Sequence, residues 1–169
     1  DLLLEEVLSR TSYPLVLPAE VSLGGIRKPL EGFLKYASLG HVNLILDPDG
    51  IIRKFPPRLK EDKETLRAFA LELFEKISPD SEISKEEILR IAYSQQPGST
   101  RRIPLARLAE DTRLVENLKN KIILIGATAA DLHDAQLTPF SRGAEMPGVE
   151  IQANILNMFL KGYRLEELA

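Results

Sequence analysis

The clearest structural signal in the sequence is VNLILDPDGIIRKF, residues 42–55. Two apolar runs flank the tetrapeptide DPDG, which places Asp47 first, Pro48 second and Gly50 fourth in a turn. This order is typical of a type I turn followed by a left-handed glycine, a common loop between antiparallel strands. The stretch therefore predicts a β-hairpin, which ends at the pair Pro56-Pro57.

Helical and strand patterns alternate on both sides of this hairpin. The apolar spacing predicts helices over residues 1–10, 29–37, 63–77 and 147–161, and a partly helical stretch over 105–118. It predicts strands over 13–17, 88–93 and 121–126, with loops over 21–28 and 127–145. The run KIILIG at 121–126 is continuously apolar and β-branched, which is typical of a strand buried on both faces. The alternation predicts an α/β fold: a mixed β-sheet with one β-hairpin, covered by helices, in a single domain over residues 1–169.

The composition supports a folded core and excludes several classes of function. The chain has 169 residues, of which 44% are hydrophobic and 28% charged, so it is not a disordered protein. A net charge of −3 provides no general attraction to nucleic acid, and the basic pair Arg101-Arg102, without interleaved aromatic residues, is interpreted as a solvated face. Because Cys is absent, disulfides, thiolate metal sites and cysteine nucleophiles are excluded.

Membrane and targeting segments are not visible in the sequence. The longest run without Asp, Glu, Lys or Arg is residues 36–46, which is shorter than the roughly 20 residues of a membrane-spanning helix. No signal peptide is recognisable either. The chain begins with Asp1 rather than Met, so we expect it to be a piece of a longer protein.

The common catalytic motifs are missing, so we expect no catalytic residue and no cofactor. Neither a Rossmann nor a Walker glycine loop occurs, and the sequence has no G-x-S-x-G and no H-E-x-x-H. The densest cluster of candidate metal ligands is Asp131, His133 and Asp134, which we treat as a solvated loop with a metal site as the alternative. An alternative function is a small soluble α/β enzyme or an anion-binding domain that uses the loop from Gly126 to Asp134.

Three blocks of the sequence resemble one known family. They are GHVNL at 40–44 with DPDGIIR at 47–53, KIILIGATAADLHDAQLTP at 121–139, and PGVEIQANIL at 147–156. In this order they resemble the CHASE domain of the second type, a cyclase- and histidine-kinase-associated sensory extracellular domain. Gln152 stands where the family usually has His. The resemblance further implies that the chain is the C-terminal portion of the family domain and lacks its N-terminal part, so that its sheet is incomplete or is completed by another chain.

The resemblance also implies a function. Such domains are extracytoplasmic, periplasmic or extracellular, and they belong to bacterial membrane-anchored signalling proteins such as adenylate or guanylate cyclases, histidine kinases and Ser/Thr kinases. The catalytic module is cytoplasmic, so this chain is expected to be a sensor and not an enzyme. Its expected partners are an unidentified small-molecule or physical stimulus and a second copy of the chain, with no nucleic acid.

Candidate ligand-binding residues lie on two loops. The loop over 127–145 follows the predicted buried strand, and α/β sheets place ligand sites at that edge, which points to Asp134, Thr138 and Pro139. Asp49 and Arg53 at the hairpin complete the set. Each has a structural alternative, in which Asp134 bonds loop amides, Thr138 and Pro139 fix a turn, and Arg53 pairs with a carboxylate. The helix over 147–161 is the expected output element.

Overall fold

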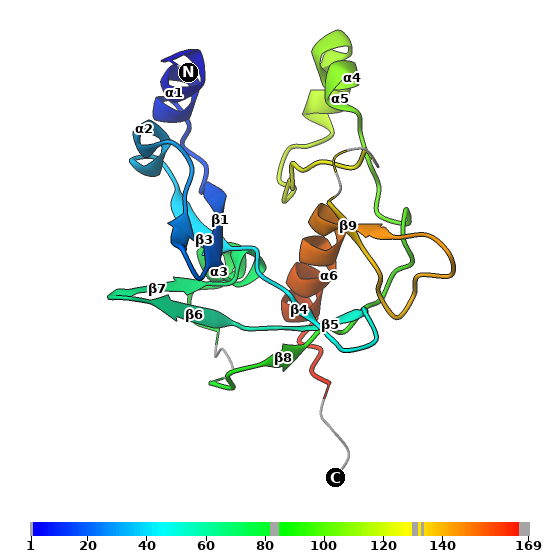
Figure 1. Cartoon of the computed structure of the whole chain (residues 1–169). Coiled ribbons are helices and arrows are strands. Elements are labelled where there is room, and N and C mark those ends of the chain that lie inside the picture. The colour runs from blue at the N-terminus through cyan, green and yellow to red at the C-terminus, as the bar shows by residue number, and fades with distance from the viewer. Residues whose placement is uncertain (1, 82–84, 130–131, 133, 166–169) are drawn as a thin grey trace.

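The computed structural model describes residues 2–81, 85–129, 132 and 134–165 (Figure 1). Its helices are α1 (Leu2–Ser9), α2 (Glu31–Leu34), α3 (Phe69–Ile77), α4 (Leu105–Glu110), α5 (Thr112–Glu116) and α6 (Gly148–Leu160). Its strands are β1 (Val16–Ser22), β2 (Gly25–Arg27), β3 (Ser38–His41), β4 (Ile45–Leu46), β5 (Ile52–Phe55), β6 (Arg58–Glu61), β7 (Glu64–Arg67), β8 (Leu89–Arg90), β9 (Ala135–Gln136) and β10 (Met146–Pro147).

The strands form several small sheets rather than one large sheet. In the order β2-β1-β3, strand β1 is antiparallel to β2 and parallel to β3, so this sheet is mixed. The order β4-β5-β8 is antiparallel, and β6-β7 and β9-β10 are antiparallel pairs. The predicted fold class, an α/β domain with a mixed sheet, is confirmed.

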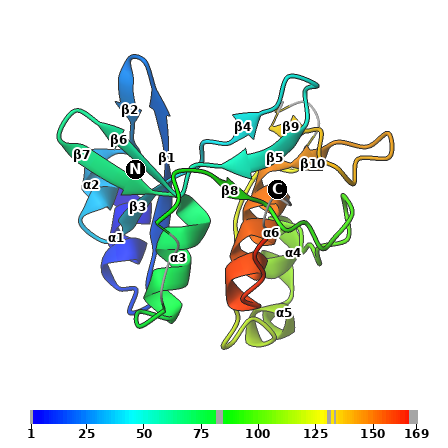
Figure 2. The same cartoon turned by 90° about the horizontal axis from the view of Figure 1, so that it is seen from below.

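The elements fall into two groups that meet at α3 and α6. Figures 1 and 2 show α1, α2 and the strands β1, β2, β3, β6 and β7 on one side, and α4, α5 and the strands β4, β5, β9 and β10 on the other. Helix α3 packs against α6, and one hydrophobic core includes residues from both helices, from β5 and from the segment after β8. The largest fully buried side chains in this core belong to Phe55, Leu71, Met146, Ile151 and Ile155.

The backbone of β3 lies directly on the start of α3. A Cβ atom added to Gly40 would lie 2.5 Å from the Cα atom of Phe69, a distance that real side chains do not tolerate. Only glycine therefore permits this approach, which also brings His41 beside Ala68 in a parallel bridge.

Two predictions from local pattern are confirmed. The hairpin is formed by β4 and β5, with a register shift between Ile45 and Leu46, and Gly50 has the expected left-handed conformation at φ 77°. The predicted helix over 147–161 is α6, and it is buried over a wide arc.

Two predicted elements are wrong because a strand partner lies next in the chain. The stretch 21–28, expected to be a loop, belongs to the β1–β2 hairpin, which turns at Gly25 with φ 105°. The first part of 63–77, expected to be helical, is β7, which pairs with β6 across a turn at Asp62. Leu66 fits both periods, because it lies on the predicted helical apolar face and is also the buried residue of β7. Cross-strand pairing with β6 therefore decides the conformation.

The predicted buried strand over 121–126 is also wrong. In the structure this run is not a strand, and Ile123 and Ile125 are 51% and 82% exposed. A buried parallel strand needs neighbours on both sides, and among the described residues no strand pairs with this run. Gly126 itself is held close to α6, since a Cβ atom there would lie 2.5 Å from Cβ of Val149.

These burial assignments predict a large loss of stability for one Ile→Ala substitution and almost no change for another. Ile155 is fully buried in α6, so Ile155→Ala should lower the free energy of unfolding by about 2–5 kcal/mol. Ile123→Ala removes the same atoms from an exposed side chain and should change the free energy of unfolding by no more than about 0.5 kcal/mol. Urea unfolding followed by circular dichroism measures both. Equal losses would contradict the exposed position of Ile123.

Candidate functional site

The turn between β4 and β5 is fixed by its own backbone and by one aspartate. The amide of Gly50 donates to the carbonyl of Asp47 at 2.8 Å, and the amide of Asp47 donates to the carbonyl of Ile51 at 3.1 Å. The Oδ1 atom of Asp49 accepts from the amide of Ile51 at 3.2 Å. This turn points both aspartates toward the next strand.

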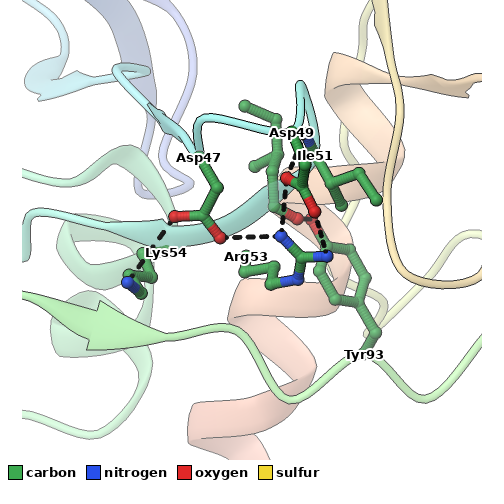
Figure 3. A network of polar contacts seen from close by, with 7 residues as sticks. Asp47, Asp49, Ile51, Arg53, Lys54 and Tyr93 are labelled. Atoms are coloured by element: carbon green, nitrogen blue, oxygen red, sulfur yellow. Dashed lines mark hydrogen bonds and ion pairs between the residues drawn. The ribbon is translucent and has the colours of Figure 1, made fainter.

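Arg53 on β5 holds both aspartates together (Figure 3). Its guanidinium binds Asp49 through two parallel contacts, Nη1 to Oδ1 at 2.9 Å and Nη2 to Oδ2 at 2.7 Å. Nη1 also donates to Oδ2 of Asp47 at 2.9 Å, and Nζ of Lys54 lies 3.5 Å from Oδ1 of the same carboxylate. We call these four residues the aspartate–arginine corner.

The charges of the corner balance one another. Hydrogen bonds from Arg53 lower the pKa of both Asp47 and Asp49, and the two carboxylates raise the pKa of Arg53. Asp47, Asp49 and Arg53 therefore keep their charge at neutral pH, and two carboxylates face two cations. A ligand with a single charge would have to displace one of these contacts. The arrangement therefore orients β5, and Asp49 and Arg53 bind each other, as in the structural alternative.

The loop that contains Thr138 and Pro139 lies along β5, beside the corner. The amide of Ile52 donates to the carbonyl of Leu137 at 2.8 Å. Thr138 is 2% exposed, and its amide donates to Oγ of Ser141 at 2.9 Å, while the two hydroxyl groups are 3.2 Å apart. Pro139 is exposed. The Thr138 hydroxyl is thus used within its own turn.

Tyr93 connects the corner to the same loop. Its hydroxyl donates to the carbonyl of Ile52 at 3.0 Å, and its ring lies 6.4 Å from that of Phe140. Burial raises the pKa of Tyr93, which keeps the hydroxyl protonated as a donor. This residue was not singled out by the sequence, because its partner is a backbone atom 41 positions away.

Asp134 lies apart from the other candidates, at the start of α6. Its carbonyl accepts from the amide of Gly148 at 2.8 Å, and a Cβ atom on Gly148 would lie 2.5 Å from its Oδ1 atom. Burial raises the pKa of this carboxyl group. Within the described part of the chain, no hydrogen bond connects its side chain with Thr138 or with the corner.

The five predicted ligand-binding residues therefore occupy three places: the corner, the turn beside β5 and the start of α6. Asp131 and His133 lie outside the described residues, so the alternative metal set is not described by the structure. Among residues 2–81, 85–129, 132 and 134–165, no three His, Asp or Glu side chains gather as a metal site.

The first half of α6 contains a buried polar cluster that the sequence analysis missed. Glu150 is 2% exposed; its Oε1 accepts from Nε of Arg102 at 3.0 Å, and its Oε2 accepts from the amide of Gly98 at 2.9 Å. Arg102 is its ion-pair partner, and the arginine side chain remains 40% exposed. Asn154, one turn later, accepts from the amide of Ser94 at 3.2 Å. A glutamate within the apolar arc of a helix was the available signal, since a buried carboxylate needs a cation.

His41 is the other buried titratable group. It is 0% exposed on β3, and neither ring nitrogen has a hydrogen bond of good geometry among the described residues. Burial lowers the pKa of His41 to about 4, and the nearby Pro56 carbonyl offsets this only in part. The ring is therefore neutral at physiological pH.

The comparisons decide which family this arrangement belongs to. A family model of the CHASE2 domain matches residues 1–167. The chain belongs to the CHASE2 domain family. Its resemblance to that family, drawn from three blocks of sequence, is confirmed. CHASE2 domains are extracellular sensory domains and not catalytic ones.

No curated protein and no solved structure matches the chain significantly. In the described part of this CHASE2 domain, no helix combines the length and the apolar character that a membrane crossing requires.

His41 should make the stability of this CHASE2 domain depend on pH. The unfolded ring binds a proton near pH 6.5 and the folded ring only near pH 4, so the unfolded state binds more protons between these values. Stability should therefore fall by up to about 3 kcal/mol as pH drops from 6.5 to 4, and this contribution should change no further below pH 4.

Urea unfolding of the wild type and of His41→Leu across this range measures the effect. Because both proteins keep His133, the difference between the two profiles isolates His41. The variant should lose less stability on acidification. Parallel profiles would contradict the buried, neutral His41.

Proposed function

We propose that this CHASE2 domain is the extracytoplasmic signal-input domain of a bacterial transmembrane signalling protein. The observation that carries the proposal is the family match over residues 1–167, because the family is sensory and extracellular. An adenylate or guanylate cyclase, a histidine kinase or a Ser/Thr kinase is the attached module in this proposal. The localisation is periplasmic or extracellular, and the parent chain is anchored in the cell membrane.

The structure supports this role through the way α6 is held. A sensor needs no nucleophile or metal; it needs two conformations that a stimulus binds with different affinity. The first half of α6 is fixed by Glu150 and Asn154, and its second half packs in the core through Met158 and Phe159. A rearrangement of the core would therefore move this helix as a unit, which makes α6 the output element of the proposal.

Cysteine labelling in cells tests the proposed location. The chain contains no Cys, so Ser12→Cys at an exposed position supplies a single reactive thiol in a parent protein whose other cysteines have been replaced. We expect a maleimide that cannot cross the cytoplasmic membrane to label it in intact cells. Ala70→Cys, at a side chain that is 1% exposed, is the matched control and should react only after denaturation. Labelling of Ser12→Cys only after lysis would contradict an extracytoplasmic domain.

A further inference from the structure

His41 is a titratable group that its surroundings accept only without charge. Its side chain is 0% exposed, and among the described residues neither ring nitrogen has a hydrogen bond of good geometry. A buried imidazolium without a partner is costly, because the charge loses its hydration and gains no compensating contact. The ring belongs neither to the aspartate–arginine corner nor to the polar cluster of α6, so no role described above uses it.

Strand β3 is held tightly around His41. It pairs with β1, where Ala19 is the direct partner of His41, and it forms a parallel bridge with Ala68 at the start of α3. The preceding residue, Gly40, lies so close to Phe69 that an added Cβ atom would be 2.5 Å from the Cα atom of Phe69. The ring could therefore reach water only if β3 separated from the start of α3.

The charged groups around β3 do not stabilise a positive ring. Strand β3 packs against β1, β7 and α3. The charged residues of these elements are Glu20 on β1, Glu64 and Arg67 on β7, and Glu72, Glu75 and Lys76 on α3. All of them are engaged in ion pairs with other residues. The pKa of His41 accordingly responds to burial and to the Pro56 carbonyl, and not to a carboxylate.

Two segments beside His41 lead to the output helix α6. The carbonyl of Pro56 lies next to the His41 ring, and the preceding residue, Phe55, meets Phe159 of α6 edge to face at 6.3 Å. Helix α3, which begins beside His41, stacks Phe74 on the same ring of α6 at 5.5 Å. Because both segments hold the Phe159 ring, a separation at His41 would change the contacts that position α6.

We propose that this domain is a proton sensor, in which acidification of the extracytoplasmic medium protonates His41, separates β3 from the start of α3 and thereby moves α6. The geometry that carries the proposal is a buried imidazole without partners, placed between the two segments that hold Phe159. The proposal rests on the proposed sensory function, since it names the stimulus that the domain receives.

The expected response lies at mildly acidic pH. In an opened state the exposed ring has a pKa near 6.5, whereas in the closed state described above burial lowers the pKa to about 4. Because the opened state binds the proton more tightly, acidification raises the ratio of opened to closed molecules. Relative to a pH at which both rings are neutral, this ratio rises about tenfold at pH 5.5 and about 30-fold at pH 5.

The distance between two spin labels on the 169-residue chain tests the movement. Because the chain has no Cys, Ser22→Cys at the end of β1 and Lys161→Cys directly after α6 attach one label to each side of the contact, both at exposed positions. Electron–electron resonance should show a second distance whose share, relative to the first, rises about 30-fold from pH 7.5 to pH 5. A distance distribution that stays unchanged down to pH 4.5 would overturn the proposal.

Histidine variants of the labelled chain assign the response to one ring. His41→Leu and His41→Gln cannot be protonated and should keep a single distance at every pH. His133→Asn removes the other histidine of the chain, so it is the matched control and should respond like the parent. If both His41 variants fold and still respond like the parent, another group takes up the proton and the proposal is wrong.

Circular dichroism at each pH separates movement from unfolding. The helical signal should persist while the second distance appears; loss of both together would reduce His41 to a group that affects global stability, and the switch would be refuted. If neither His41 variant folds, the chain that carries His41 decides the question. Its ratio of the two distances should then rise about sevenfold between pH 6 and pH 5, as uptake of one proton requires, and a flat profile would overturn the proposal.

The two proposals fail in different experiments. An unchanged distance distribution removes the proton as the stimulus and leaves the extracytoplasmic location, which the labelling of Ser12→Cys tests. Labelling of Ser12→Cys only after lysis removes the sensor role, and the response of the isolated chain to pH is unaffected by it.

Discussion

The contact of three phenylalanine rings joins the segments on which the rest of the structure depends. Phe159 of α6 meets Phe55 of β5 edge to face, with centroids 6.3 Å apart, and stacks on Phe74 of α3 at 5.5 Å. Such aromatic pairs contribute about 0.5–1.5 kcal/mol each beyond the burial of their area. Phe74 and Phe159 also line a cleft of about 680 Å³ between β8 and the ends of α3 and α6. The same rings therefore hold α6 in place and form part of this cleft.

Two polar arrangements position the elements around these rings. Arg53 binds both aspartates of the corner and so fixes the turn that leads into β5. Glu150, paired with Arg102, fixes the first half of α6 to the segment that precedes α4. Because removal of Arg102 would leave a buried carboxylate without its cation, this pair constrains where α6 can lie. Both arrangements thus serve the fold by linking segments that are distant in the sequence.

The sequence predicted those parts of the fold that local pattern determines. The DPDG turn has a residue preference at each position, and α6 has an apolar arc long enough to identify it. The start of 63–77 was mistaken for helix because Leu66 fits both periods and only the pairing with β6 distinguishes them. The run over 121–126 carries the composition of a buried strand without a strand partner in the described structure. The pairing of Glu150 with Arg102 and the cleft were not predictable, because both bring together residues from distant segments.

If α6 and α3 form one cooperative unit with β5, native-state hydrogen exchange will show it. We expect the most protected amides of α3 and α6 to open with the same free energy and the same dependence on denaturant, as in global unfolding. If the amides of α6 exchange through a smaller opening while those of α3 stay protected, the helix is not anchored by the phenylalanine contact, and it could not transmit the state of the core.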